Sequence, residues 1–150
     1  MDVAAALWGG IFGAIAAAVV YVGFLALRLT RFDLLRFQGG LLARERTNMV
    51  YLYGALVMLV LGALLALGYR YVFEQISSAS YVGWGALLGL VQGVVLLLLL
   101  PLLGIVNHNV RGGDEDRPGF AGLAAGRLTP VAVLVASVVF GIWVGLLLVP

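Results

Sequence analysis

The stretch Tyr81–Val106 reads YVGWGALLGLVQGVVLLLLLPLLGIV and carries no charged residue. It exceeds the roughly 20 apolar residues that a helix needs to cross the hydrocarbon core of a bilayer. Within it Gly85, Gly89 and Gly93 recur every four residues, which on a helix forms a narrow ridge without side chains. Such a ridge lets a second helix approach until the two backbones touch. The stretch therefore predicts a membrane-spanning helix that packs through its glycines.

Gln92 lies beside this glycine ridge, three residues after Gly89 and seven after Gly85. Residues at these spacings share nearly the same helix face, whereas the opposite face consists of Leu and Val and suits lipid. We interpret the amide as a hydrogen-bonding group between helices. Two alternatives stay open: Gln92 lines a path through the membrane, or it contacts a lipid head group.

The composition predicts a small membrane protein with one domain. Hydrophobic residues make up 63% of the 150 positions and charged residues 11%, far from the values of soluble domains. The length suits four spans with short connections and leaves no room for a separate soluble domain. We therefore expect an all-α bundle of four antiparallel transmembrane helices. The predicted spans are about 3–27, 49–69, 81–106 and 130–149, and the long connections are 28–48 and 107–129.

Small residues at four-residue spacing also mark the first and last spans. Gly9 and Gly13 recur in this way in the first span, and Gly141 and Gly145 do so in the last. Such pairs are typical of packing faces between helices in lipid. The alternative for the first span is that it is simply Ala- and Gly-rich, as proteins from GC-rich genomes often are.

The arginines predict the orientation. The chain has nine Arg and no Lys, a usage that indicates a prokaryotic source with a GC-rich genome. Five Arg lie in 28–48 and three in 107–129, whereas the link between the second and third spans has only Arg70. Cytoplasmic loops carry the excess of basic residues. We therefore expect a multi-pass protein of the cytoplasmic (inner) membrane, with both long connections in the cytoplasm and both termini outside.

The connection 28–48 is the most basic segment. Phe32 and Leu35, with Leu34 as a further candidate, can share one face of a short helix while the charged residues face water, which suits a helix that lies in the membrane interface. We expect Gly39-Gly40 to end this helix. Its arginines either hold anionic lipid head groups or a partner, or they belong to an ordinary cytoplasmic loop. The candidate head-group ligands are Arg28, Arg31 and Arg36.

The connection 107–129 offers few ligands for a metal or a cofactor. It opens with Asn-His-Asn and continues with Gly, Asp and Glu residues that predict a mobile polar loop. His108 is the only histidine and the chain has no cysteine, whereas metal sites need several N, O or S ligands. We therefore expect no metal site and no cofactor. His108 stays as the one candidate cofactor ligand, with a simple polar helix end as the alternative.

The cores of the predicted spans contain no Asp, Glu, Arg, Lys or His. Proton-coupled pumps and many ion-coupled carriers keep such a residue near the middle of the membrane. Intramembrane proteases need a Ser/His, Asp/Asp or metal constellation, which the spans lack. We therefore expect a protein that is not an enzyme. The arginines flank the spans and form no stripe, which argues against nucleic acid as a partner.

Four features follow one another along the chain. They are the Gly-rich first span, the basic Phe32–Arg36 segment, the pair Gly39-Gly40, and Gly85–Gly93 leading to Pro101. In this order they resemble an uncharacterised prokaryotic family of small four-span integral membrane proteins, in which histidines often occupy positions such as that of Gln92. The resemblance covers most of the chain and implies a four-span fold. Because the family has no assigned activity, it implies no particular function.

Three hypotheses for the function follow from these features. The leading one is a structural or accessory subunit of a larger membrane protein complex, or a homo-oligomer packed through its glycine ridges. The second is a small transporter or channel with a path lined by Gln92 and the glycine faces. The third is a lipid-, quinone- or pigment-binding membrane module, with arginines at the inner interface and His108 as a ligand. The expected partners are membrane lipids and either other membrane subunits or further copies of the chain.

Overall fold

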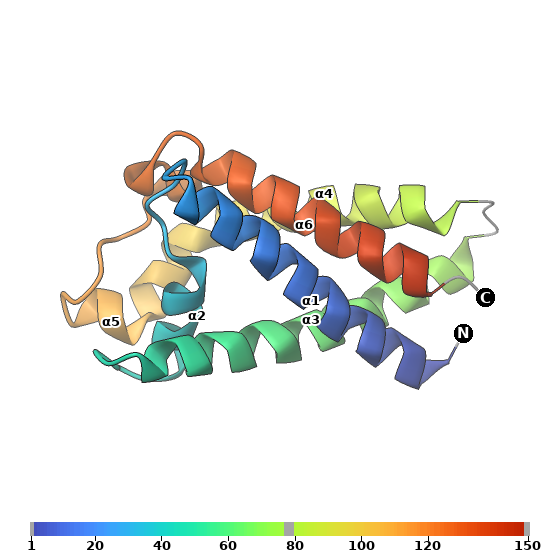
Figure 1. Cartoon of the computed structure of the whole chain (residues 1–150), viewed down its shortest axis with the longest axis horizontal. Helices are drawn as coiled ribbons and strands as arrows, with labels where there is room; N and C mark the ends of the chain where they lie inside the picture. The colour runs from blue at the N-terminus through green and yellow to red at the C-terminus, as the bar shows by residue number, and fades with distance from the viewer. Residues whose placement is uncertain (1, 77–79, 149–150) are drawn as a thin grey trace. The chain divides into compact units, whose positions relative to one another are not determined.

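The computed structural model describes residues 2–76 and 80–148, and within these ranges the chain is helical without any strand. Four helices are long and apolar enough to cross a membrane. The protein is therefore a multi-pass, all-α membrane protein with a four-helix bundle, as the sequence predicted. The elements in chain order are α1 (Val3–Ala26), α2 (Leu34–Leu42), α3 (Met49–Gln75), α4 (Tyr81–Val106), α5 (His108–Arg111), the 3-10 helix η1 (Phe120–Ala125) and α6 (Thr129–Leu147) (Figure 1).

The second span is the one whose length differs most from the prediction. α3 continues to Gln75, six residues beyond the predicted end. The added turns carry Arg70 and Glu74, whose side chains form an ion pair of 2.9 Å at the spacing i, i+4. Tyr69 of this helix is only 5% exposed and lies inside the bundle.

The chain forms two compact units, and each of the four spans contributes a segment to both. The first unit consists of residues 1–20, 59–94 and 134–150, and the second of residues 21–58 and 95–133. The second unit therefore contains α2, α5 and η1 together with the adjoining ends of the spans.

In the first unit, α4 and α6 touch through their backbones. A Cβ atom added to Gly85 would overlap the carbonyl oxygen of Gly141, and one added to Gly89 would overlap that of Ser137. A Cβ on Gly93 would lie 3.0 Å from the side chain of Ser137. The glycine ridge of α4 therefore faces α6 of the same chain along its whole length.

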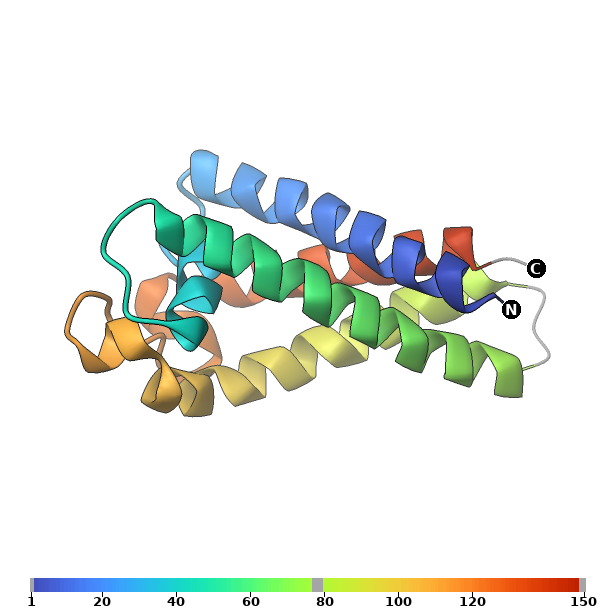
Figure 2. The ribbon, with the colours of Figure 1, turned by 90° about the horizontal axis from the view of Figure 1, so that it is seen from below.

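The other helices of the first unit complete a ring. α1 lies beside α3, where a Cβ on Gly10 would overlap the carbonyl oxygen of Gly62 (Figure 2). α1 also contacts α6, because a Cβ on Gly13 would lie 3.1 Å from the ring of Phe140. α3 is joined to α4 by a hydrogen bond that the Tyr69 hydroxyl donates to Gln92 Oε1 at 2.9 Å.

The outward surface of these helices is apolar. On α4 most exposed side chains are Leu and Val, which suit contact with lipid chains rather than water. They recur along most of the helix: Leu87, Leu90, Val91, Val94, Val95, Leu98, Leu99 and Leu102.

In the second unit, α2 is a packed helix, and its boundaries differ from those predicted. Asp33 caps its N-terminus, because Oδ1 accepts a hydrogen bond of 3.0 Å from the backbone N–H of Arg36. Its buried apolar side chains are Leu34 and Phe37. Phe32, which we placed on the apolar face of the helix, is buried but precedes it, and Leu35 is half-buried.

The prediction that Gly39-Gly40 ends this helix is wrong, because α2 continues to Leu42. Both glycines serve close packing instead. A Cβ on Gly39 would overlap the carbonyl oxygen of Val50 in α3, and one on Gly40 would overlap the side-chain amide of Asn107. From the opposite side, a Cβ on Gly54 of α3 would overlap the carbonyl oxygen of Leu35. Close packing therefore outweighs the low helix propensity of glycine here.

Candidate functional site

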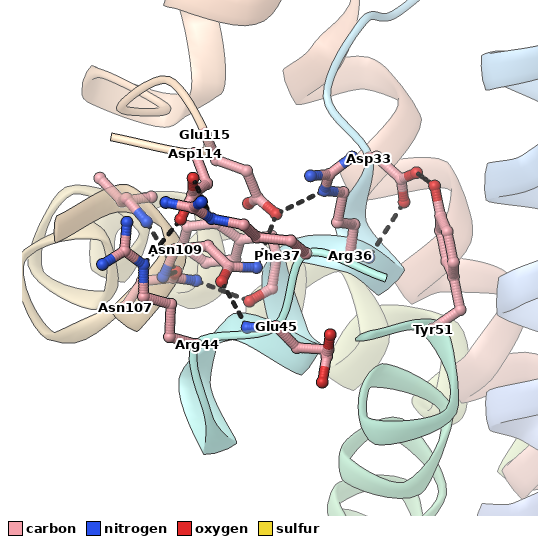
Figure 3. Close-up of polar contacts among 12 residues, drawn as sticks. Asp33, Arg36, Phe37, Arg44, Glu45, Tyr51, Asn107, Asn109, Asp114 and Glu115 are labelled. Atoms are coloured by element: carbon pink, nitrogen blue, oxygen red, sulfur yellow. Dashed lines mark hydrogen bonds and ion pairs between the residues drawn. The ribbon is translucent and has the colours of Figure 1, made fainter. Parts of the chain in front are cut away.

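The two long connections meet in the second unit and form the densest group of polar contacts in the described part of the chain. We call this group the polar cap (Figure 3). Its members come from α2, the segment after it, the start of α3, and the connection that follows α4. They are Asp33, Arg36, Arg44, Glu45, Arg46, Tyr51, Asn107, Asn109, Asp114 and Glu115.

Asn107 is the residue at the centre of the polar cap. It is fully buried, and its Nδ2 donates a hydrogen bond of 2.7 Å to the carbonyl oxygen of Phe37 in α2. Its Oδ1 accepts hydrogen bonds from the backbone N–H groups of Asn109 at 2.9 Å and Val110 at 3.1 Å, and so caps α5. One side chain therefore begins α5 and fixes it to α2.

Asn109 extends this network to the other side of the cap. It is also fully buried, and its Oδ1 accepts a hydrogen bond of 2.9 Å from the backbone N–H of Glu45. Its Nδ2 donates to Glu115 Oε1 at 3.1 Å, and the same oxygen accepts a hydrogen bond of 2.8 Å from Arg36 Nε. The Arg36–Glu115 ion pair is thereby held by a buried amide as well as by its own charges.

Asp114 binds two arginines of the first connection. Its Oδ2 accepts from Arg44 Nε at 2.8 Å, and its Oδ1 lies 2.9 Å from Arg46 Nε. Arg44 also donates to the carbonyl oxygen of Gly112. The hydrogen bond from Arg44, and after it the one from Arg46, lowers the pKa of the Asp114 carboxyl below its ordinary value. Two of the acidic residues that we expected on a mobile loop, Asp114 and Glu115, are therefore bound to arginines of the first connection.

The polar cap reaches α3 through Asp33. While its Oδ1 caps α2, its Oδ2 accepts a hydrogen bond of 2.8 Å from the Tyr51 hydroxyl. At the base of α3, Glu45 accepts hydrogen bonds from the backbone N–H and the hydroxyl of Thr47, both at 2.8 Å. These bonds, the backbone one first, lower the pKa of the Glu45 carboxyl.

A second set of contacts joins the ends of α1 and α6. The hydroxyls of Thr30 and Thr129 lie 2.7 Å apart, and both residues are buried. Thr129 begins α6, and its hydroxyl is hydrogen-bonded to that of Thr30. The backbone N–H of Arg31 donates to the carbonyl oxygen of Ala125 in η1 at 3.1 Å. The two connections are therefore linked by backbone as well as side-chain bonds.

A pocket of about 400 Å³ lies between these two sets of contacts. Its wall carries charges of both signs and also apolar side chains. The lining residues are Arg31, Phe32, Asp33, Arg36, Asp114, Glu115, Asp116, Arg117, Pro118, Ala124 and Ala125.

The predicted head-group ligands differ in their surroundings. Arg36 is half-buried and bound to Glu115, so its charge is already neutralised. The side chains of Arg28 and Arg31 are exposed and form no ion pair within residues 2–76 and 80–148. Arg28 has a φ of 57°, a left-handed conformation at the point where the chain leaves α1.

His108 stands at the start of α5, where its Nδ1 lies 3.1 Å from the carbonyl oxygen of Gly40. In the part of the chain that the structure describes, no three His, Asp or Glu side chains are grouped as metal ligands. The polar contact of the His108 side chain is therefore with the backbone of α2.

Most of the predicted packing glycines lie in close contact with a neighbouring helix. Gly85, Gly89, Gly93 and Gly141 face the backbone or side chains of the neighbouring helix. Gly145 faces the backbone of Tyr81, and Gly13 the ring of Phe140, whereas Gly9 makes only an ordinary contact of 3.5 Å to Leu147. Gln92 contacts Tyr69 of α3. The packing and hydrogen-bonding residues thus belong to the first unit, and the polar cap belongs to the second.

Sequence reasoning missed the two most buried polar residues of the polar cap, Asn107 and Asn109, which it treats only as neighbours of His108. The available signal was local: an Asn directly after a long apolar span, followed by a few residues of helix-forming sequence, is a helix N-cap pattern. The partners of these amides lie some 60 to 70 residues away in sequence and leave no local trace.

Comparison of the chain with family models, with curated proteins and with solved structures finds no match.

Proposed function

We propose that the protein is a structural or accessory subunit of a larger membrane protein complex and is not an enzyme. The observation that carries this proposal is the polar cap. Its two buried asparagines and its ion pairs bind the two connections to each other, so that the cap presents a defined surface at one end of the spans. A defined polar surface outside the bilayer is what a partner subunit needs for specific recognition.

The contacts of Gln92 support this proposal over a transport path. Its Oε1 accepts from the Tyr69 hydroxyl, and the glycines beside it are covered by α6. A path lined by Gln92 and the glycine faces requires these groups to be turned toward water. In the first unit they are instead used for helix packing.

The same glycine contacts favour a partner subunit over a homo-oligomer packed through glycine ridges. Gly85 and Gly89 of α4 are already in contact with α6 of the same chain. A second copy would therefore meet the Leu and Val side chains on the outward face of α4. Those side chains lack the close backbone approach that makes glycine faces selective for another helix.

We further infer that the polar cap lies in the cytoplasm and that both termini lie outside. The contacts within the cap support a location of both long connections on the same side of the membrane. These connections hold eight of the nine arginines. The positive-inside rule then assigns that side to the cytoplasm. From the use of Arg without Lys we infer a prokaryotic source and hence a prokaryotic cytoplasmic membrane. From the resemblance above we infer membership of the small four-span family.

The experiment is covalent capture in native membranes. A tagged protein carrying a photo-crosslinker at the exposed position Arg111 is irradiated, purified and resolved by mass. We expect one defined adduct that disappears when Asn107→Ala disorganises the cap and that survives Arg70→Ala at the other end of α3. A set of adducts that is the same in all three proteins would contradict the proposal, because random neighbours do not depend on the cap.

A further inference from the structure

We propose that the pocket beside the polar cap binds the phosphoethanolamine head group of a membrane phospholipid. This inference concerns a lipid ligand and does not depend on the partner subunit proposed above. It rests on the charges that line the pocket and on the position of the pocket at the ends of the spans.

Most charges in the pocket wall are already bound to other groups. Arg36 is paired with Glu115, and Asp114 with two arginines of the first connection. Asp33 accepts a hydrogen bond from the Tyr51 hydroxyl and caps α2. These groups shape the pocket, and their polar atoms are already engaged, those of Asp33 by hydrogen bonds alone and the others by ion pairs.

Three charged side chains of the wall remain without a hydrogen bond or ion pair within residues 2–76 and 80–148. They are Arg31, Arg117 and Asp116, and all three are exposed. Two cations and one anion form a pattern that a zwitterion matches. A phosphodiester accepts hydrogen bonds from the two guanidinium groups, while a primary ammonium donates to the carboxylate.

This pattern discriminates between head groups. An anionic head group without an ammonium, such as phosphatidylglycerol, would leave Asp116 facing a negative ligand with its own charge uncompensated. A choline head group carries its positive charge on methylated nitrogen, which has no N–H to donate to Asp116. The ethanolamine head group offers both the phosphate and the ammonium donors.

The surroundings of the pocket favour a lipid over a soluble phosphoethanolamine. Arg31 follows the end of α1 by five residues, and its backbone is bound to Ala125, just before α6. Apolar side chains beside both segments are exposed, including Leu27 at 72% and Phe120 at 66%. Acyl chains cover such side chains at the membrane boundary, whereas water does not.

The test measures lipid binding to the purified, delipidated protein by native mass spectrometry. Phosphatidylethanolamine, phosphatidylglycerol, phosphatidylcholine and free O-phosphoethanolamine are titrated separately. We expect phosphatidylethanolamine to bind most tightly. Arg117→Gln should weaken it roughly tenfold, the loss of one charge-assisted contact. Arg111→Gln serves as the matched control, because Arg111 is exposed in the same connection but does not line this pocket.

Asp116→Asn gives the sharpest result. Removing this uncompensated carboxylate should weaken phosphatidylethanolamine and strengthen phosphatidylglycerol, so that the preference reverses. Equal affinities for the three lipids in the wild-type protein, or an unchanged preference in Asp116→Asn, would overturn the proposal. Free O-phosphoethanolamine binding as tightly as the lipid would overturn the lipid as the source of the head group.

Discussion

The side-chain amide of Asn107 donates a hydrogen bond of 2.7 Å to the carbonyl oxygen of Phe37, 70 residues earlier in the chain. The same side chain caps α5 through its Oδ1. A single buried side chain thus bonds to both long connections.

Asn107→Ala should destabilise the protein by about 1–3 kcal/mol, since it leaves the Phe37 carbonyl and two backbone N–H groups of α5 without buried partners. The stability of Asn107→Asp should lie between those of the wild type and Asn107→Ala, because aspartate keeps the capping oxygen but cannot donate a hydrogen bond to the Phe37 carbonyl. Thermal unfolding in mild detergent measures the differences. Arg70→Ala is the control and should cost only about 0.3–0.5 kcal/mol for its i, i+4 ion pair. Equal losses in Asn107→Ala and Arg70→Ala would refute the central role of Asn107.

Gly89→Ala should separate α4 from α6, because its new Cβ overlaps the carbonyl oxygen of Ser137. We expect a loss of about 1–3 kcal/mol, and a larger one for Gly89→Leu. Gly68→Ala is the matched control, since a Cβ at Gly68 of α3 meets no atom within 4 Å. It should be neutral or slightly stabilising, and Leu90→Ile on the exposed face should be tolerated. If Gly89→Ala unfolded at the same temperature as Gly68→Ala, the close contact would have no energetic importance.

Acid should weaken the polar cap through Asp114. The bonds from Arg44 and Arg46 lower its pKa in the folded protein from an ordinary value of 3.8. The unfolded chain therefore takes up a proton first as the pH falls. The stabilisation from Asp114 is complete above about 3.8 and is lost as the pH falls through the lower, folded pKa. Asp114→Asn should make the unfolding temperature less dependent on pH below about 4. A pH dependence identical in wild type and Asp114→Asn would show that this carboxylate contributes nothing.

Cysteine labelling should place the polar cap in the cytoplasm. The chain has no native cysteine, so single replacements report unambiguously. A membrane-impermeant maleimide added to intact cells should label Gln75→Cys, at the exposed end of α3, but label Arg111→Cys only after permeabilisation. The opposite pattern would reverse the proposed orientation while leaving the fold unchanged.

The protein should conduct no protons or cations by itself. Reconstituted into liposomes with a pH gradient or a membrane potential, the wild type should give the flux of empty liposomes. Gln92→Leu and Tyr69→Phe, which remove the hydrogen bond between α3 and α4, should give the same result. A wild-type flux that either variant abolished would establish the transporter hypothesis instead.

The spans could be predicted from the sequence because long, uncharged apolar runs flanked by arginines are typical of membrane-spanning helices. The predicted span 81–106 coincides with α4, whereas the predicted second span stops before Arg70 although α3 continues through it. Close contacts within membrane helices follow small residues, so the glycines of α4 were also identifiable, although not the helix they face. The resemblance to a four-span family does not predict the contacts of the polar cap, and membership of that family remains a hypothesis.

The polar cap could not be predicted for a different physical reason. Its bonds join side chains to groups about 70 residues away, and no periodicity encodes such a partner. Gly39-Gly40 misled the prediction because glycine has a low helix propensity, while the contact with α3 requires a residue without a side chain. The same packing accounts for the burial of Leu34 and Phe37 in α2.

The most direct test of the central claim is the mass of the particle extracted from native membranes with a mild detergent or a lipid-preserving polymer. A single chain has a mass of 15.8 kDa. As a subunit of a larger complex, the protein should be found in a particle whose protein mass is well above 15.8 kDa and includes at least one different chain in fixed ratio. A particle that contains this chain alone, whether one copy or several, would contradict the account.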